Sequence, residues 1–334
     1  MKVLVGFSGG VDSTAAILLL KERGYSPVAV TFIFNEFFEA QKTDEIARKI
    51  GVPIVKIDLR DEFERAIIKK FIEEYKSGRT PNVCGLCNRD FKIRRLAMLM
   101  EELGADLIAT GHYARILEIK GKKFIARARD KDQSYFLALV RKEDLEKLVL
   151  PLGDVTKEWV RQYVEAHGVK IARDEESQDV CFVRGKFREF METRVGVKPG
   201  QIIGPDGEVV GIHNGIQYYT VGQRRGLEVA LGRRVYVGRI EPGTNRVYLQ
   251  EKDEIYRKFM IVEDLNWFNG PAEGEFLVQI RNVHRAAPAR VKLVDSEVLV
   301  EFDEPQWAPT PGQIAAFYRD DVLVGGGIIK SSYN

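Results

Sequence analysis

A glycine-rich run near the start of the chain has the composition of a phosphate-binding loop. The run is Gly6-Phe7-Ser8-Gly9-Gly10-Val11-Asp12-Ser13, between an apolar, β-rich segment and a segment of helical composition. Backbone N–H groups and the helix dipole bind anions at such a junction, and adjacent glycines let the backbone approach a phosphate closely. Neither Gly-Lys-Ser/Thr nor G-x-G-x-x-G is present, which excludes a Walker loop and a dinucleotide fingerprint.

Three cysteines supply candidate reactive sulfur. Cys84 and Cys87 form a C-x-x-C pair just before a predicted helix, and Cys181 lies far later in the chain. A thiol near a helix N-terminus has a lowered pKa, and Lys186 and Arg188 lie close to Cys181 in the sequence, so we expect thiolate character at these positions. Three cysteines in a chain of this size do not predict a disulfide framework.

Alternating strands and helices must position these residues. The pattern predicts strands at Lys2–Phe7, Pro27–Phe34, Pro53–Leu59 and Asp106–Thr110, and helices at Ser13–Arg23, Thr43–Ile50, Asp61–Lys76 and Arg89–Leu103. Such alternation predicts a parallel sheet covered on both faces. The cysteine pair falls in the predicted loop Ser77–Asn88, directly before the fourth helix.

The pattern changes after Tyr113. Residues Ala114–Ala128 predict a hairpin that turns at Lys120-Gly121, and Thr156–His167 predicts a helix with Thr156 as its N-cap. Residues 255–334 contain several short strands, which indicates a small barrel or sandwich.

Composition favours a protein of two or three domains. The chain has 334 residues, 45% of them hydrophobic, and a net charge of +2. Basic residues gather in two stretches: residues 184–246 hold eleven Lys or Arg against six Asp or Glu, and residues 279–292 hold four basic residues and no acid. A polyanion such as RNA would be attracted to them, although a solvated basic surface also fits. We expect no signal peptide and no membrane span, and therefore a cytoplasmic protein.

Over its full length the chain resembles the bacterial tRNA-specific 2-thiouridylases. The matching segments are GFSGGVDS at residues 6–13, GRTPN at 78–82, LCN at 86–88, Gly111-His112-Tyr113, KDQSYFL at 131–137, SQDVCF at 177–182, VGQRRGL at 221–227 and TPGQ at 310–313. The first of these resembles the pyrophosphate loop (PP-loop) of N-type ATP pyrophosphatases.

The resemblance implies an α/β fold in three parts. Residues 1–193 would form a parallel-sheet PP-loop ATP pyrophosphatase domain (adenine nucleotide alpha hydrolase-like). Residues 194–254 would form a small basic central domain that contacts tRNA, and residues 255–334 a C-terminal β-barrel. The implied enzyme is a sulfurtransferase. It uses ATP and Mg²⁺ to adenylate the C2 oxygen of the wobble uridine in tRNAs for Lys, Glu and Gln, and replaces that oxygen with sulfur.

The resemblance also assigns roles to individual residues. Cys87 would be the catalytic thiol and Cys181 the persulfide carrier. Gly6, Phe7, Ser8, Gly9, Gly10, Val11, Asp12, Ser13, Phe32 and Gly111 would bind ATP. Asn82, Val83 and Cys84 would face the target base, and the tRNA would contact His112, Lys131, Asp132, Gln133, Arg281, Asn282 and Gln313. A cysteine desulfurase, a persulfide relay protein or free sulfide would donate the sulfur.

The chain departs from the family at Cys84, where the family usually has Asp. Three interpretations stay open. In the first, Cys84 is a tolerated substitute, and Cys181 carries the persulfide as the resemblance implies. Alternatively, Cys84, Cys87 and Cys181 hold a 4Fe-4S cluster with one open iron, because clusters normally take four thiolates. In the third reading, Cys84 and Cys87 form a redox pair or part of a zinc site.

Two other functions remain open. The same loop class serves adenylating enzymes that transfer nitrogen, such as amide- or lysine-transferring ligases. The chain is alternatively a non-catalytic tRNA-binding protein, although the intact loop argues against this.

Overall fold

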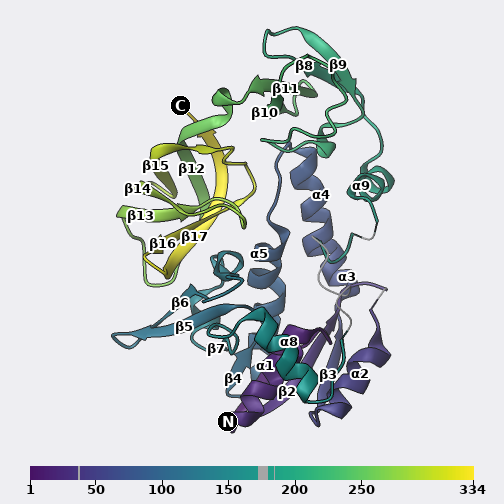
Figure 1. Cartoon of the computed structure of the whole chain (residues 1–334), viewed down its shortest axis with the longest axis vertical. Coiled ribbons are helices and arrows are strands. Elements are labelled where there is room, and N and C mark those ends of the chain that lie inside the picture. The colour runs from purple at the N-terminus through teal and green to yellow at the C-terminus, as the bar shows by residue number, and fades with distance from the viewer. Residues whose placement is uncertain (37, 172–179, 184) are drawn as a thin grey trace.

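The chain forms an N-terminal domain with a parallel sheet, a small central domain and a C-terminal barrel (Figure 1). The structure, a computed structural model, describes residues 1–36, 38–171, 180–183 and 185–334. The Ser177–Asp179 part of the predicted Cys181 segment lies outside these residues. Within the described ranges, no helix is long and apolar enough to span a membrane.

Five parallel strands make the N-terminal sheet, which confirms the predicted sheet type. Their order is β3-β2-β1-β4-β7, with bounds β1 Lys2–Gly6, β2 Ser26–Ile33, β3 Ile54–Asp58, β4 Leu107–Ala109 and β7 Leu148–Val149. Strand β1 pairs with β2 on one side and β4 on the other, so the strand order reverses beside β1. Open α/β sheets bind ligands at such a reversal, beyond the carboxyl ends of the strands.

Both faces of this sheet are covered, which explains the continuous apolar run of β1. Val3 and Val5 pack with α1 (Val11–Glu22), α2 (Ala40–Lys49) and α8 (Lys157–Ala166). Leu4 faces the opposite core, which includes Phe63 and Leu96. The helical elements on that side are α3 (Arg60–Phe63), η1 (Glu64–Ile68), α4 (Lys69–Lys76), α5 (Val83–Cys87), η2 (Asn88–Lys92) and α6 (Ile93–Glu102).

The helix that carries the cysteine pair begins earlier than predicted. We expected a loop up to Asn88, but α5 begins at Val83. The Asn82 side chain caps this helix, because its Oδ1 accepts a hydrogen bond from the Gly85 N–H at 3.0 Å. The loop prediction was wrong at this point, and both cysteines lie on a helix.

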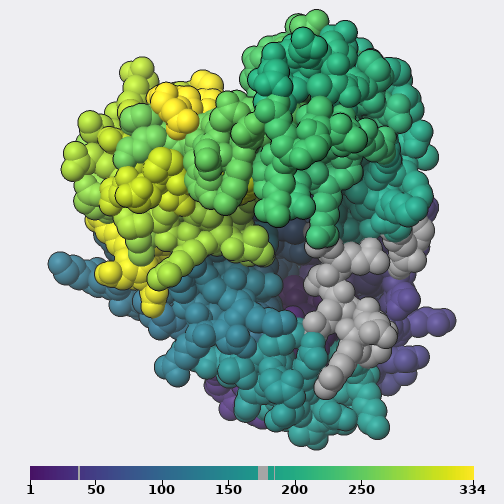
Figure 2. Space-filling view, turned by 45° about the horizontal axis from the view of Figure 1, so that its top comes forward, coloured from purple at the N-terminus to yellow at the C-terminus, as the bar shows by residue number. Residues whose placement is uncertain are grey.

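The central domain contains a four-stranded sheet of order β10-β11-β8-β9, with bounds β8 Gly200–Ile203, β9 Val209–His213, β10 Val235–Glu241 and β11 Arg246–Glu251. Helix α9 (Phe187–Val195) precedes it. Its small core includes Ile202, Val237 and Val247. In Figure 2 this green domain lies beside the yellow-green barrel, and both lie above the N-terminal domain.

The C-terminal part is a closed six-stranded barrel, because β12 and β17 pair with each other as well as with their other neighbours. The strands are β12 Tyr256–Trp267, β13 Gly274–Gln279, β14 Ala287–Val294, β15 Glu297–Trp307, β16 Ile314–Arg319 and β17 Val322–Tyr333. Closure settles the choice between barrel and sandwich and removes the free edges of the sheet.

The predicted hairpin is confirmed and joins two domains. Its strands are β5 (Ala114–Ile119) and β6 (Lys122–Arg127), which pair antiparallel. Strand β6 also pairs with β17 of the barrel, where Ala126 lies opposite Val322. The hairpin therefore continues the barrel sheet toward the N-terminal domain (Figure 1).

Candidate functional site

The glycine-rich loop connects β1 to α1 at the reversal of strand order. Gly9 has a φ of +74°, a conformation that favours glycine, and Gly10 is the N-cap of α1 without a capping side chain. The Ser8 hydroxyl accepts a hydrogen bond from the Gly10 N–H at 3.3 Å, and the Ser13 hydroxyl donates to the Gly10 carbonyl at 3.0 Å. These contacts hold the loop in shape at the positive end of a helix, which is an anion-binding arrangement.

The loop carboxylate is held by two residues distant in sequence. The Lys157 ammonium lies 2.6 and 2.8 Å from the two oxygens of Asp12, and the Tyr113 hydroxyl donates to Asp12 at 2.7 Å. Lys157 begins α8, whose N-cap is Thr156, as predicted. Sequence reasoning found this helix start but missed Lys157 itself.

A cavity of about 860 Å³ joins the loop to a cysteine. Its wall includes Ser8–Asp12, Cys181, Lys131 and Gln133. Among the residues that the structure describes, six basic side chains line it, against three acidic ones: Lys42, Lys92, Lys131, Lys157, Arg161 and Lys170 against Asp12, Glu158 and Glu165. The excess of positive charge suits a polyanion such as a triphosphate.

The three cysteines differ in exposure. Cys87 is buried, Cys84 is partly buried and Cys181 is exposed, and none forms a disulfide bond. Burial raises the pKa of the Cys87 thiol to about 12, and the charge of Lys92 acts against this shift. We predicted a lowered pKa from the nearby helix N-terminus, and for Cys87 that prediction is wrong because burial removes the thiol from water.

The three cysteines are not arranged as a metal site. Among the described residues, no group of three His, Cys, Asp or Glu side chains is placed to hold a metal ion. As they lie here, Cys84, Cys87 and Cys181 therefore do not fit a 4Fe-4S cluster, and the cysteine pair does not fit zinc.

Several residues predicted to contact tRNA lie near the cavity. His112 follows β4, its Nδ1 lies 2.8 Å from the Thr110 hydroxyl, and burial lowers its pKa to about 3, with the Lys92 charge adding to the effect. Gln133 accepts a hydrogen bond from the Tyr113 N–H at 3.0 Å. The neutral imidazole of His112 can therefore accept or donate a hydrogen bond without carrying charge.

Four other residues that we predict to contact tRNA, Asp132 and three residues of the barrel, are not part of the cavity wall. Asp132 accepts hydrogen bonds from Arg127 and from Ser134. Arg281 donates to the Val221 carbonyl at 2.9 Å and to Thr310, and Asn282 beside it is exposed. Gln313 donates to the Thr80 carbonyl at 2.8 Å. Asp132, Arg281 and Gln313 thus hold protein segments together, and a role toward tRNA stays a prediction for each.

The remaining predicted residues flank the loop or the cysteine helix. Phe32 is buried at the end of β2. A Cβ on Gly111 would lie 2.8 Å from the Asp12 carbonyl carbon, so Gly111 permits the close approach of the loop. Val83 and Asn82 are buried at the start of α5.

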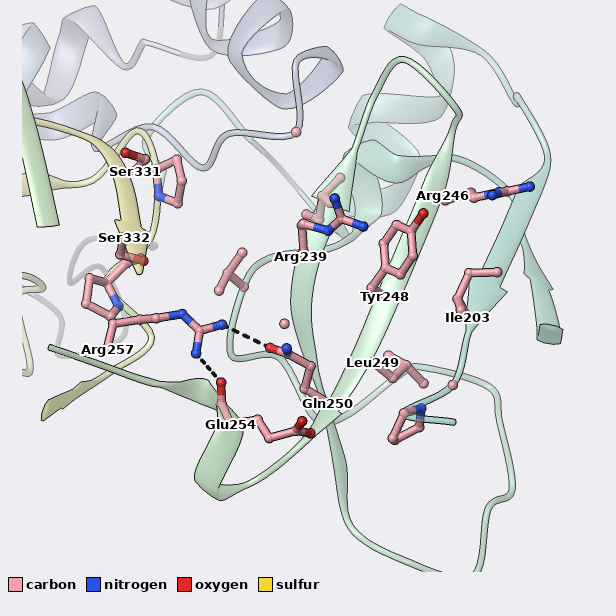
Figure 3. A pocket seen from close by; sticks show the side chains of 18 of the residues that line it. Ile203, Arg239, Arg246, Tyr248, Leu249, Gln250, Glu254, Arg257, Ser331 and Ser332 are labelled. Carbon is pink, nitrogen blue, oxygen red and sulfur yellow. Dashed lines mark hydrogen bonds between the residues drawn. The ribbon is translucent and has the colours of Figure 1, made fainter. Parts of the chain in front are cut away.

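A second cavity of about 580 Å³ lies between the central domain and the barrel (Figure 3). The Arg239 guanidinium lies over the Tyr248 ring, 4.0 Å from its centroid. Arg257 donates to the Gln250 side chain at 3.0 Å and to the Glu254 carbonyl. Ser331 and Ser332 complete the wall on the barrel side. The cavity contains neither the phosphate loop nor a cysteine, and its guanidinium groups suit an anionic ligand.

The parallel sheet and its loop define a nucleotide-binding domain of the HUP class, and a family model described as "tRNA methyl transferase HUP domain" matches residues 1–185. Models described as "tRNA methyl transferase PRC-barrel domain" and "Aminomethyltransferase beta-barrel domain" match residues 188–251 and 257–329.

Relatives of similar length specify the family further. The tRNA-specific 2-thiouridylase MnmA of Aquifex aeolicus is 40% identical to this chain, and the match covers 99% of each. That of Carboxydothermus hydrogenoformans is 41% identical over 98% of this chain and 97% of its own. That of Syntrophomonas wolfei is 38% identical over 98% and 100%. The chain belongs to the tRNA-specific 2-thiouridylase family.

Proposed function

We propose that this protein is an ATP-dependent tRNA-uridine 2-sulfurtransferase. The observation that carries the proposal is the cavity of about 860 Å³ whose wall contains both the phosphate loop and Cys181. A carbonyl oxygen activated at the loop would thus meet a sulfur carrier without leaving the site. Membership of a family named for tRNA 2-thiolation supports the substrate class.

The first step activates the base. The uracil C2 oxygen attacks the α-phosphate of ATP and displaces pyrophosphate, which leaves an O-adenylyl group at C2. The loop N–H groups, Ser8 and Ser13 would hold the phosphates. Lys157 fixes the Asp12 carboxylate beside the loop, and a carboxylate is the ligand type that Mg²⁺ prefers. Mg²⁺ would there neutralise phosphate charge.

The second step delivers sulfur. The terminal sulfur of a Cys181 persulfide attacks C2, loses its proton and displaces AMP. The Cys87 thiolate then attacks the Cys181 Sγ, which forms a Cys87–Cys181 disulfide and leaves the sulfur on C2. In the alternative order, Cys87 attacks first and releases sulfide, which displaces AMP. A dithiol reductant restores both thiols in either case.

We infer that the basic regions bind the tRNA. Residues 184–246 and 279–292 carry excess positive charge, and the second cavity brings Arg239 and Arg246 of the first stretch together with Arg257. The expected substrates are tRNAs for Lys, Glu and Gln, modified at the wobble uridine. A cysteine desulfurase, a relay protein or free sulfide would load Cys181. A tRNA substrate and the absence of a disulfide among the three described cysteines suit the cytoplasm.

Nucleoside analysis of tRNA tests the function directly. Unmodified tRNA is incubated with the protein, ATP, Mg²⁺ and a sulfide or persulfide source, and 2-thiouridine is measured by mass spectrometry. We expect ATP-dependent 2-thiouridine and one pyrophosphate per thiolation. Replacing Cys87 with Ser should abolish 2-thiouridine while tRNA-dependent pyrophosphate release persists. Full thiolation by the Ser variant would refute the role of Cys87, and absence of 2-thiouridine from the wild type would refute the function.

A further inference from the structure

Lys92 lies in the wall of the cavity of about 860 Å³, close to the cysteine sulfurs. It is partly buried and lines the cavity that contains Ser8–Asp12 and Cys181. Among the residues that the structure describes, its ammonium group has no hydrogen bond and no acidic partner. The other deeply placed lysine of the cavity, Lys157, is by contrast paired with Asp12. An uncompensated cation at such a depth needs an anionic partner during function.

The helix places Lys92 on the side of Cys87. Residues Asn88–Lys92 form the wide turn η2, in which residue i faces residue i+5 rather than i+4. The Lys92 backbone N–H accordingly donates toward the Cys87 thiol. In a regular α-helix a spacing of five would turn the lysine away from the cysteine. This single wide turn therefore places Lys92 on the same side of the helix as the buried Cys87 sulfur.

Within the described part of the chain, the titratable groups coupled to Lys92 are three cysteine sulfurs and one neutral imidazole ring. Burial lowers the pKa of Lys92, but Cys87, Cys181 and Cys84 act more strongly together and raise it. His112 is the fourth neighbour, and the charge of Lys92 adds to the lowering of the His112 pKa. Lys92 therefore stays charged beside three thiols, in a place where the Cys87 thiolate is otherwise disfavoured.

We propose that Lys92 is a positioning residue that supplies the fixed positive charge under which the buried Cys87 sulfur acts as an anion in sulfur transfer. The proposal rests on the proposed function and adds a residue to it. In this role the ammonium group opposes part of the loss of water that raises the pKa of the buried Cys87 thiol. The same charge faces Cys181, so it remains close to the negative sulfur while the Cys87–Cys181 disulfide forms.

Alkylation of Cys87 tests the charge without ATP or tRNA. The intact protein is treated with iodoacetamide between pH 6 and 10, and the modified Cys87 peptide is quantified by mass spectrometry. We expect Lys92→Met to slow Cys87 alkylation at pH 7.5 by about tenfold and to move its pH profile upward by about one unit, because a neighbouring charge shifts a pKa by 1 to 3 units. Lys92→Arg should restore most of the rate. Lys170→Met removes an exposed lysine of the same cavity wall and serves as the control.

Two further readouts separate this role from others. Lys92→Met should lose about tenfold in 2-thiouridine formation, and its loss in tRNA-dependent pyrophosphate release should be clearly smaller. Unchanged Cys87 alkylation in Lys92→Met would overturn the proposal. Loss of pyrophosphate release with normal alkylation would also overturn it and assign Lys92 to the phosphates. If the wild type made no 2-thiouridine, the proposed function would fail while the alkylation result would still stand.

Discussion

Gly111→Ala is the sharpest test of how the phosphate loop is held. The added Cβ would lie 2.8 Å from the Asp12 carbonyl carbon, 2.9 Å from the Ser13 nitrogen and 3.0 Å from the Asp12 oxygen. Ordinary van der Waals contact begins at 3.4 Å, so the loop must move by about 0.6 Å (3.4 − 2.8). All three neighbours are backbone atoms, and no side-chain rotation can relieve the overlap.

The expected loss follows from that displacement. Overpacking of this kind costs about 1 to 3 kcal/mol of folding free energy. A misplacement of about 1 Å at a reacting centre costs roughly a hundredfold in rate, so a shift of about 0.6 Å should cost on the order of tenfold. The assay is tRNA-dependent pyrophosphate release, with the KM for ATP measured in parallel. We expect a higher KM and a lower kcat for Gly111→Ala.

Gly243→Ala is the matched control, because an added Cβ there has no neighbour within 4 Å and the glycine has no positive φ. It should retain the wild-type rate and KM. If Gly111→Ala behaved like Gly243→Ala in both constants, the argument that this glycine sets the position of the loop would be refuted.

Three other changes have defined outcomes. Lys157→Met should reduce pyrophosphate release by at least tenfold, because Asp12 loses its cation, while Lys157→Arg should recover part of the rate. Gly85→Ala should weaken thiolation, because its Cβ would lie 2.2 Å from the Ile314 Cδ1, and adding Ile314→Val should restore activity by removing that atom. A Gly85→Ala variant as active as wild type would contradict this packing. Finally, His112 is neutral in the folded state down to a pKa of about 3 but takes up a proton near pH 6.5 when unfolded. Stability should therefore fall as pH drops from about 6.5 toward 3, and His112→Asn should lose less stability over that window in denaturant titrations.

The loop and the parallel sheet were predictable because their signals are local. Gly6–Ser13 follows a buried strand directly and opens a helix, and each of these features is readable within a few residues. The hairpin at Ala114–Ala128 was predictable for the same reason. What the sequence could not show is that this hairpin joins the barrel, since that pairing connects Ala126 to Val322.

The residues that sequence reasoning missed depend on long-range placement or on an irregular turn. Lys157 meets Asp12 across 145 positions of sequence. Lys92 is only five positions after Cys87, but it faces the thiol because the helix widens there. No residue type in the sequence predicts such a wide turn. The pKa of Cys87 was mispredicted because a local rule, the helix dipole, was applied without knowledge of burial.

The barrel and the cysteine helix are joined by two of the segments that resemble the family. The Thr80 N–H donates to the Pro311 carbonyl at 2.8 Å, and the Asn82 N–H donates to the Gly312 carbonyl at 3.2 Å. Gly312 has a φ of +93°, and a Cβ there would meet three backbone atoms of Thr80 at 3.0 Å. Asn82 in turn caps α5, the helix that carries Cys87. A barrel that shifts on binding RNA would therefore move the start of the cysteine helix with it. On this view the two segments are needed together because they connect substrate binding to the position of the thiol.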